Sequence, residues 1–327
     1  DRGHRDRGIG MSEPLDPEVV HALERGSFCH VVTRSRFGPH LTPMVFALSE
    51  GRLWVTTSRS SVKARAWRQE PSVGGFVRAG ETGVMFAGRV RTYDLLDARS
   101  WQRALRQTPA LAAASLRFTR KNARFFAGYA VDAHHVPLSW TPPGRVFVEI
   151  ELERTALVDH QGVRRVWGTW PSGVASRAAF RADRRGREAL RGLPRGLLKI
   201  LGHEGRGVLG VEGTAGLVAL PAGWALDGPA LYAVAPIPVL ELAGMTDPAP
   251  TVALGMDRPS WWRARLMVGA MVQGRAEVAV PDLLRSGRAS AVRHLAQIGS
   301  GADRALLRLR PHRLVWWEGW TSGSARV

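Results

Sequence analysis

Residues 53–67 read LWVTTSRSSVKARAW, and this stretch carries the strongest structural signal in the chain. An apolar run that ends in hydroxyl residues is typical of a strand leaving a hydrophobic core. A serine-rich turn follows, and serine is a preferred N-cap residue for a helix. The stretch therefore predicts a strand, a tight turn and a short helix that begins near Ser60.

Polar groups gather where this helix begins. The first helical N–H groups have no partner within the helix, and the helix dipole is positive at that end. Hydroxyls and cations beside such an end make a phosphate site. An ordinary capped surface helix with solvated cations is the alternative that the residues leave open. The candidate phosphate-binding residues are Thr56, Thr57, Ser58, Ser61, Lys63 and Arg65.

The flanking sequence predicts a small antiparallel barrel. Asp16-Pro17-Glu18 is a helix start, and Ser49-Glu50-Gly51 is a hairpin turn between two strand-like runs. Meandering strands around short helices favour an antiparallel barrel over a parallel sheet. We expect strands at 29–33, 41–48, 52–57, 73–77, 84–93 and 145–158, and helices at 17–25, 60–69 and 98–127.

The second half of the chain repeats this order. Residues 231–235 match 53–57, residues 247–252 echo 70–73, residues 265–280 echo 84–93, and residues 307–313 echo 148–154. An internal repeat fixes the architecture, so two tandem antiparallel barrels are expected. The predicted organisation is a flexible N-terminal extension at 1–15, a first barrel at 16–170, a basic linker at 171–206 and a second barrel at 207–327.

Composition limits the function classes. The 327 residues are 45% hydrophobic and 23% charged, which suits a globular protein with a sizeable core. Cys29 is the single cysteine, so an intrachain disulfide and a cysteine-rich zinc site are excluded, and a reducing cytoplasm is the expected location. The net charge of +18 favours anionic ligands without choosing among them.

Two further segments bear on targeting. Residues 1–10 are polar and charged, so we expect a leader or an upstream extension before Met11 and no signal peptide. Residues 212–241 are weakly charged but are broken by Asp227 and four prolines. They are therefore expected to form buried strands and not a membrane helix.

Four motifs in the first half together resemble a known family. They are His40–Phe46, Gly51–Thr57, the Ser-x-Lys-x-Arg motif at Ser61–Arg65, and Glu70–Val73. This combination is similar to the flavin-binding split β-barrel of the pyridoxamine 5′-phosphate oxidase-like superfamily, which includes relatives that use a deazaflavin cofactor. The resemblance covers about residues 16–158 well and 207–320 weakly.

The resemblance implies a mainly β protein with short helices, in which the two split barrels form an intramolecular pseudodimer. It implies that the hydroxyls of residues 56–58, with Lys63 and Arg65, hold the phosphate of FMN. The strand with Thr42, Pro43 and Val45 would lie along the isoalloxazine ring, and Arg89 would face the flavin or the substrate. The implied function is an FMN-dependent oxidoreductase acting on a small molecule, as a monomeric pseudodimer or a homodimer of it. The motif requires no particular acid or base, so no catalytic side chain is assigned.

The second copy is expected to have lost this site. Alignment of Leu53 with Leu231 places prolines opposite the serine-rich turn and Glu241 opposite Lys63. A glutamate would repel a phosphate, so the sequence predicts one flavin per chain.

Two other functions stay open from the sequence. One is a non-catalytic carrier of flavin, deazaflavin or haem on the same scaffold. The other is an arginine-rich nucleic-acid-binding protein, for which the linker 171–206 is the best support. No aromatic RNA-binding motif or helix-turn-helix signal accompanies the linker, so nucleic acid is ranked last.

Overall fold

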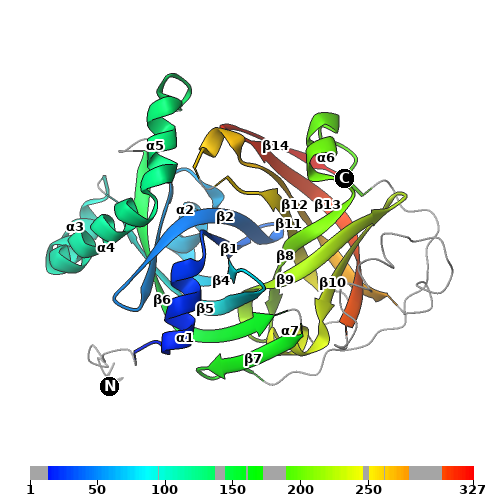
Figure 1. Ribbon diagram of the computed structural model, residues 1–327, viewed down its shortest axis with the longest axis horizontal. Coiled ribbons are helices and arrows are strands. Elements are labelled where there is room, and N and C mark those ends of the chain that lie inside the picture. Colours follow the sequence, from blue (N-terminus) through cyan, green and yellow to red (C-terminus); the bar gives the residue numbers. More distant parts are fainter. Residues whose placement is uncertain are drawn as a thin grey trace, which may run out of the picture.

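The computed structural model describes residues 14–94, 96–136, 144–159, 161–171, 189–245, 250–260, 262–279 and 304–327. These residues form two seven-stranded antiparallel sheets that lie side by side (Figure 1). The strand orders are β3-β2-β1-β4-β5-β6-β7 and β10-β9-β8-β11-β12-β13-β14. Pairing of β3 with β6 and of β10 with β13 closes six strands of each sheet into a barrel. The predicted fold of two tandem split barrels is thus confirmed.

The first barrel contains α1 (Pro17–Arg25), β1 (Phe28–Ser35), β2 (Gly38–Ser49), β3 (Arg52–Ser58), α2 (Val62–Gln69), β4 (Ser72–Ala79), β5 (Thr82–Tyr93), β6 (Arg145–Asp159) and β7 (Gly162–Trp167). Between β5 and β6 lie the helices α3 (Ala98–Arg106), α4 (Thr108–Lys121) and α5 (Ala123–Val131), and the short η1 (Ala133–His135). The second barrel contains α6 (Arg195–Leu201), β8 (Glu204–Gly213), β9 (Gly216–Asp227), β10 (Ala230–Pro236), α7 (Ile237–Leu242), β11 (Thr251–Arg258), η3 (Ala264–Leu266), β12 (Val268–Ala279), β13 (Arg304–Glu318) and β14 (Thr321–Arg326).

The two barrels share their strand register as well as their strand order. Leu53 pairs with Leu48 in the first barrel, and Leu231 pairs with Leu226 in the second. The register between β5 and β6 shifts between Ala87 and Gly88, and the register between β12 and β13 shifts at the matching place, between Gln273 and Gly274. These matches confirm the internal repeat that the sequence indicated.

The hydrophobic core of the second barrel extends to the first barrel, whose interior forms a core of its own. Val32 and Leu41 of the first barrel pack in the same cluster as the buried strands of the second. At Gly74 on β4, a Cβ atom would lie 2.0 Å from the carbonyl oxygen of Leu217 on β9, so only glycine permits this approach. Nε2 of His30 lies 3.0 Å from Oδ1 of Asp257 across the same interface, and both side chains are buried. The barrels therefore pack as the predicted intramolecular pseudodimer.

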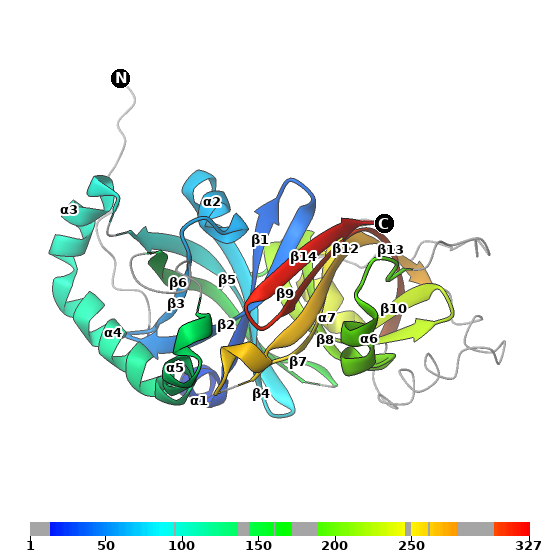
Figure 2. The same ribbon diagram turned by 90° about the horizontal axis from the view of Figure 1, so that it is seen from above.

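The predicted long helix at 98–127 is broken into three helices that cover the outer side of the first barrel (Figure 2). Pro109 lies in the first turn of α4, where proline is tolerated, and it separates α4 from α3. The side-chain amide of Asn122, between α4 and α5, donates to the carbonyl oxygens of Phe118 and Phe46. The break at Asn122 is thus fixed by a contact with β2 that no local pattern reveals.

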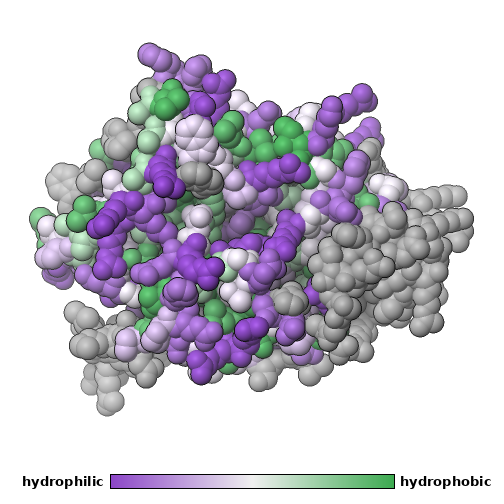
Figure 3. Space-filling view, viewed as in Figure 1, coloured by the Kyte–Doolittle hydropathy of each residue, from purple (hydrophilic) through white to green (hydrophobic). Residues whose placement is uncertain are grey.

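Part of the expected linker packs against the second barrel. Residues 172–188 lie outside the described residues, but Leu193, Leu197 and Leu201 are buried in the shared core. Residues 212–236 form strands as expected, whereas 237–242 form the short helix α7, which was not expected. Among the described residues, every helix is too short or too polar to cross a membrane. Hydrophilic residues predominate on the face shown in Figure 3, and its hydrophobic areas are scattered.

Substitution at Gly74 tests the packing of the two barrels. We expect Gly74→Ala to lower the free energy of unfolding by about 1–3 kcal/mol, because the new methyl group overlaps the Leu217 carbonyl. Gly196→Ala is the matched control, since a Cβ at Gly196 meets no atom within 4 Å. Urea denaturation of both variants measures the difference. Equal stability of the two variants would contradict the close approach of β4 and β9.

Candidate functional site

The strand–turn–helix predicted at residues 53–67 is present. The Ser61 side chain caps α2 by accepting from the Ala64 N–H at 3.1 Å. The hydroxyls of Thr57 and Ser61 lie 3.1 Å apart, as do those of Ser58 and Ser60. The hydroxyls of the predicted phosphate site therefore gather in one turn at the start of α2.

Arg145 reaches the same turn from a distant part of the chain. It begins β6 and lies opposite Ser58, because β6 pairs with β3 to close the barrel. Its guanidinium donates to the hydroxyl of Thr56 at 2.7 Å and to the Thr56 carbonyl oxygen at 2.8 Å. Closure of the barrel thus adds an arginine that the sequence motif does not contain.

Lys63 and Arg145 form a partly buried pair of cations. Lys63 is half-buried, and burial followed by the charge of Arg145 lowers its pKa to about 8. Burial also lowers the pKa of Arg145. Two like charges in a poorly solvated place destabilise each other, and a bound anion would relieve both.

His40 on β2 and Arg313 on β13 extend this cluster. Burial, and then the charges of Lys63 and Arg313, lower the pKa of His40 to about 3, so its imidazole is neutral at pH 7. Arg313 comes from the second barrel and lies 4.4 Å from the ring centre of Phe37. The site is therefore shared between the two barrels.

Three buried polar atoms beside the cluster have no hydrogen-bond partner within the described part of the chain. They are Oγ1 of Thr33, Nδ1 of His40 and Oγ1 of Thr42. Thr33 and His40 are cross-strand partners on β1 and β2, and Thr42 follows His40 on the same face of β2. Buried polar atoms without partners are rare in folded proteins and point to a ligand or ordered water that completes them.

Aromatic residues form another wall of the site. Tyr129 on α5 stacks edge-on against Trp320, with ring centres 5.3 Å apart. Burial, opposed by the charge of Arg145, raises the pKa of Tyr129 to about 12, so its hydroxyl stays protonated.

Arg263 of the second barrel donates to Asp132 at the end of α5, which ties this helix to the second barrel.

The other predicted site residues are not all in this cluster. Arg65 is exposed on α2, and it lies on a different face from Lys63 because residues two apart on a helix do not face each other. Arg89 is exposed on β5, across from Glu151. Pro43 and Val45 are half-buried on the face of β2 opposite Thr42.

Sequence reasoning missed several residues of the cluster. His40 lies within one of the family motifs without a role there, and Thr33, Tyr129, Arg145 and Arg313 belong to none of these motifs. The apolar runs around these residues predict strands and a helix but no site. Only the closed barrel and its packing on the second one bring them together.

The second barrel differs at the corresponding helix. Arg304 pairs with Pro236 as Arg145 pairs with Ser58, so the aligned strands were predicted correctly. However, α7 is capped by Pro236 itself, whereas α2 is capped by Ser61, three residues beyond the end of β3. Counted from these caps, Pro238 and not Glu241 takes the place of Lys63. The predicted alignment of Glu241 with Lys63 was therefore wrong, because the second barrel lacks the turn between the strand and the helix.

Comparison with known proteins concerns the first barrel. Residues 16–136 match the family model described as pyridoxamine 5′-phosphate oxidase, which confirms the resemblance found in the sequence. No curated protein matches the chain.

Several solved structures are similar to part of the chain. A pyridoxamine 5′-phosphate oxidase-related, FMN-binding protein from Nostoc punctiforme PCC 73102 is 19% identical, with 47% of this chain and 88% of its own covered and a TM-score of 0.33. An FAD-binding protein from Mesorhizobium loti is 19% identical, covering 44% of this chain and 94% of its own, with a TM-score of 0.29. An F420 reductase is 18% identical, covering 43% and 98%, with a TM-score of 0.29.

The low pKa of His40 predicts a pH dependence of stability. The pKa is about 3 in the folded protein, against about 6.5 for an unperturbed histidine. Between these values only the unfolded chain binds the proton, so the free energy of unfolding should fall as the pH drops below about 6.5. The slope from this group is up to about 1.4 kcal/mol per pH unit.

Urea denaturation of wild type and His40→Gln between about pH 7 and pH 4 measures this slope. We expect the slope to be smaller in His40→Gln. The exposed His21 provides the matched control, His21→Gln. Parallel slopes for wild type and His40→Gln would show that His40 is not held neutral.

Proposed function

We propose that this protein binds one phosphate-bearing flavin-type cofactor per chain at the start of α2 and acts as a flavin-dependent oxidoreductase on a small molecule. One observation carries the proposal. The hydroxyls of Thr57 and Ser61 and the guanidinium of Arg145 meet at the turn before α2, where burial and the charge of Arg145 lower the pKa of Lys63. Buried cations without a counter-ion destabilise each other, and a bound phosphate would neutralise them.

The residues present fit such a cofactor. Lys63, Arg145 and the hydroxyls of Thr57 and Ser61 would hold the phosphate. The unpartnered side chains of β2 and the ring of Tyr129 would border the remainder of the cofactor. When bound, a flavin supplies the transfer of hydride or electrons, and the protein supplies position and electrostatics.

The residues of the chain would act on the cofactor in simple ways. Tyr129 keeps its proton, so its hydroxyl donates a hydrogen bond. His40 is neutral and offers one ring nitrogen as an acceptor or a donor, depending on its tautomer. Trp320 and Arg313 from the second barrel would keep water from that side, which is why one chain would suffice for a complete site.

FMN is the proposed cofactor, with a deazaflavin as the alternative. The match of residues 16–136 to the oxidase family model supports a flavin. FMN and the deazaflavin cofactor both present a phosphate, so a phosphate cradle accepts either. The absorption spectrum and mass of the ligand released from the purified protein distinguish them. Reduction of the bound cofactor by NADH or NADPH, and its reoxidation, would separate an oxidoreductase from a carrier.

Removal of Lys63 tests the phosphate site. A charge-assisted contact is worth about 1.5–3 kcal/mol, so Lys63→Ala should weaken FMN binding by about ten- to a hundredfold. The double variant with Arg65→Ala should lose about two to four powers of ten if Arg65 also turns to the phosphate. Riboflavin, which lacks the phosphate, should be affected far less. Fluorescence titration with both ligands measures the difference.

Arg68→Ala is the control for this experiment. Arg68 is an exposed cation in the last turn of the same helix, far along α2 from its N-cap. FMN affinity should not change in this variant. Equal weakening of FMN and riboflavin in Lys63→Ala would remove the support for a phosphate cradle.

The pKa of Lys63 predicts how cofactor affinity depends on pH. Burial lowers this pKa to about 8 in the free protein, and a bound phosphate would raise it by stabilising the ammonium form. Binding would then take up a proton above about pH 8, so FMN affinity should fall as the pH rises through this range. Lys63→Arg keeps its charge to much higher pH and should flatten the profile. Calorimetric titration at several pH values measures it, and a flat wild-type profile would contradict the assignment.

A further inference from the structure

A cleft lies on the first barrel where the C-terminal ends of α1 and α4 meet, and we call it the α1–α4 cleft. It consists of two adjoining lobes of about 410 Å³ each, which share Glu24, Arg120 and Lys121. Small-molecule sites of proteins commonly enclose roughly 300–1,000 Å³, so each lobe has the size of a binding site.

The strands of the barrel give this cleft an apolar side. Phe28 on β1 and Val45 on β2 line the first lobe, and they are cross-strand partners. Ala47 and Leu48, further along β2, line the second lobe. An apolar wall of this kind suits the ring of a ligand whose polar groups lie elsewhere in the cleft.

The helices give the cleft a basic side. Arg25 ends α1, and Arg117, Arg120 and Lys121 lie near the end of α4. The three arginines are exposed, and none of them makes a hydrogen bond or an ion pair with another described residue. Their guanidinium groups are therefore available to a ligand.

Lys121 is fixed between the two lobes. Its Nζ donates to the carbonyl oxygen of Leu23 at 3.2 Å and lies 3.6 Å from the ring centre of Phe46. Burial lowers its pKa to about 8, an effect that Cys29 and Glu24 oppose. Arg124 also lines the first lobe, but it is already engaged within the protein and is left out of the charge balance.

The charges of the α1–α4 cleft do not cancel. Arg25, Arg117, Arg120 and Lys121 are positive, and Glu24 is the acidic residue of the described wall. The C-terminal ends of α1 and α4, each equivalent to about half a negative charge, offset one further cation. A surplus of about two positive charges remains after these helix ends are counted.

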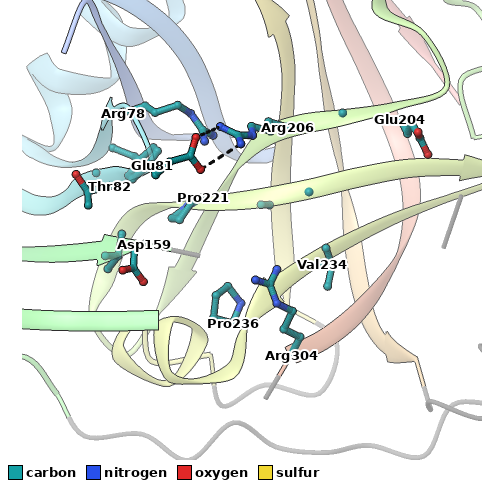
Figure 4. Close-up of a pocket in the computed structure, with 16 residues that line it drawn as sticks. Arg78, Glu81, Thr82, Asp159, Glu204, Arg206, Pro221, Val234, Pro236 and Arg304 are labelled. Atoms are coloured by element: carbon teal, nitrogen blue, oxygen red, sulfur yellow. Dashed lines mark hydrogen bonds and ion pairs between the residues drawn. The ribbon is translucent and has the colours of Figure 1, made fainter. Parts of the chain in front are cut away.

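The cavity between the two barrels differs in this respect (Figure 4). It encloses about 470 Å³, and its described wall contains three arginines and three carboxylates. Glu81 pairs with Arg206 across it, and Asp159 accepts from Arg164. That wall balances its own charges, whereas the wall of the α1–α4 cleft does not.

We propose that the α1–α4 cleft binds a nucleoside diphosphate, with its base beside Phe28 and Val45 and its diphosphate between the cations of the two helices. Guanidinium groups bind phosphate oxygens through parallel pairs of hydrogen bonds. A nucleoside diphosphate carries roughly two to three negative charges near pH 7, which matches the surplus. A monocarboxylate would neutralise only part of it. The site uses none of the cations of the candidate cofactor site, so it goes beyond the proposed function and is independent of it.

Calorimetric titration of the purified protein with ADP, without added metal ions, tests the proposal. We expect one ADP per chain and at least tenfold weaker binding of adenosine, which lacks the phosphates. Inorganic pyrophosphate should also bind more weakly than ADP, because it leaves the apolar wall uncovered. These comparisons use the unmodified protein and do not depend on the folding of any variant.

Variants locate the site. Arg120→Gln should weaken ADP binding about ten- to a hundredfold, since Arg120 lines both lobes. Arg106→Gln is the control, because Arg106 is an exposed cation at the end of α3, outside the cleft. Ser27 is exposed and lines the first lobe. Ser27→Glu should therefore weaken ADP by charge repulsion, whereas Ser27→Gln, of the same size, should do so far less.

Four results would overturn the proposal. The first is no ADP binding up to about 1 mM. The second is equal affinity for ADP and adenosine, and the third is pyrophosphate binding as tight as that of ADP, which would make the cleft a site for any polyanion. The fourth is a loss of ADP binding in Lys63→Ala but not in Arg120→Gln, which would place ADP at the candidate cofactor site. FMN binding that fails while ADP still responds to Arg120→Gln would count against the proposed function alone.

Discussion

The close approach of β4 and β9 is the constraint on which the rest of the molecule depends. A Cβ at Gly74 would lie 2.0 Å from a backbone oxygen of the other barrel, so the two sheets meet with no side chain between them at this point. This contact lets interface side chains of the first barrel, such as Val32 and Leu41, pack into the hydrophobic core of the second barrel. It also fixes where the second barrel presents Arg313 and Trp320 to the first. The candidate site is therefore a consequence of packing between the barrels as much as of the motif in residues 53–67.

The two copies kept their strands and diverged at one turn. Matching residues of the two copies form the same cross-strand pairs, because neighbouring strands on both sides fix the position of each strand. The turn before the helix has no such constraint. In the first copy it contains three residues, the last of which is the serine cap, whereas in the second the helix is capped by Pro236 at the end of β10. The loss of this turn removes its hydroxyls and the lysine of the following helix together.

Burial and like charges destabilise the ionisable residues of the first site to different extents. Lys63 and Arg145 stay close to each other under partial burial, while His40 gives up its charge altogether. A neutral histidine costs less than a third buried cation, so this arrangement limits the repulsion. The buried hydroxyls of Thr33 and Thr42, which have no hydrogen-bond partner within the described residues, also lower the free energy of unfolding. Such costs are tolerated in folded proteins at functional sites, where a ligand offsets them.

The sequence by itself determined the elements and their repetition. The alternation of apolar residues and the serine cap predicted β3 and α2 within a few residues, because these signals are local. Repeated local signals in the same order predicted the second barrel. The break of the long helix at Asn122 could not be predicted, because it depends on a hydrogen bond to Phe46 on another strand. The alignment of Pro238 with Lys63 could not be predicted either, because a missing turn does not change the pattern of apolar residues.

Only the tertiary structure decided what surrounds Lys63. Arg145 arrives through the closing pair β3–β6, and Tyr129 through a helical insertion held by the second barrel. Arg313 comes from the second barrel itself. These residues are far apart in the chain, and their juxtaposition depends on barrel closure and on the packing at Gly74. A linear pattern specifies neighbours along the chain, whereas the charges that lower the pKa of Lys63 and His40 act through space, and only the folded chain sets those distances.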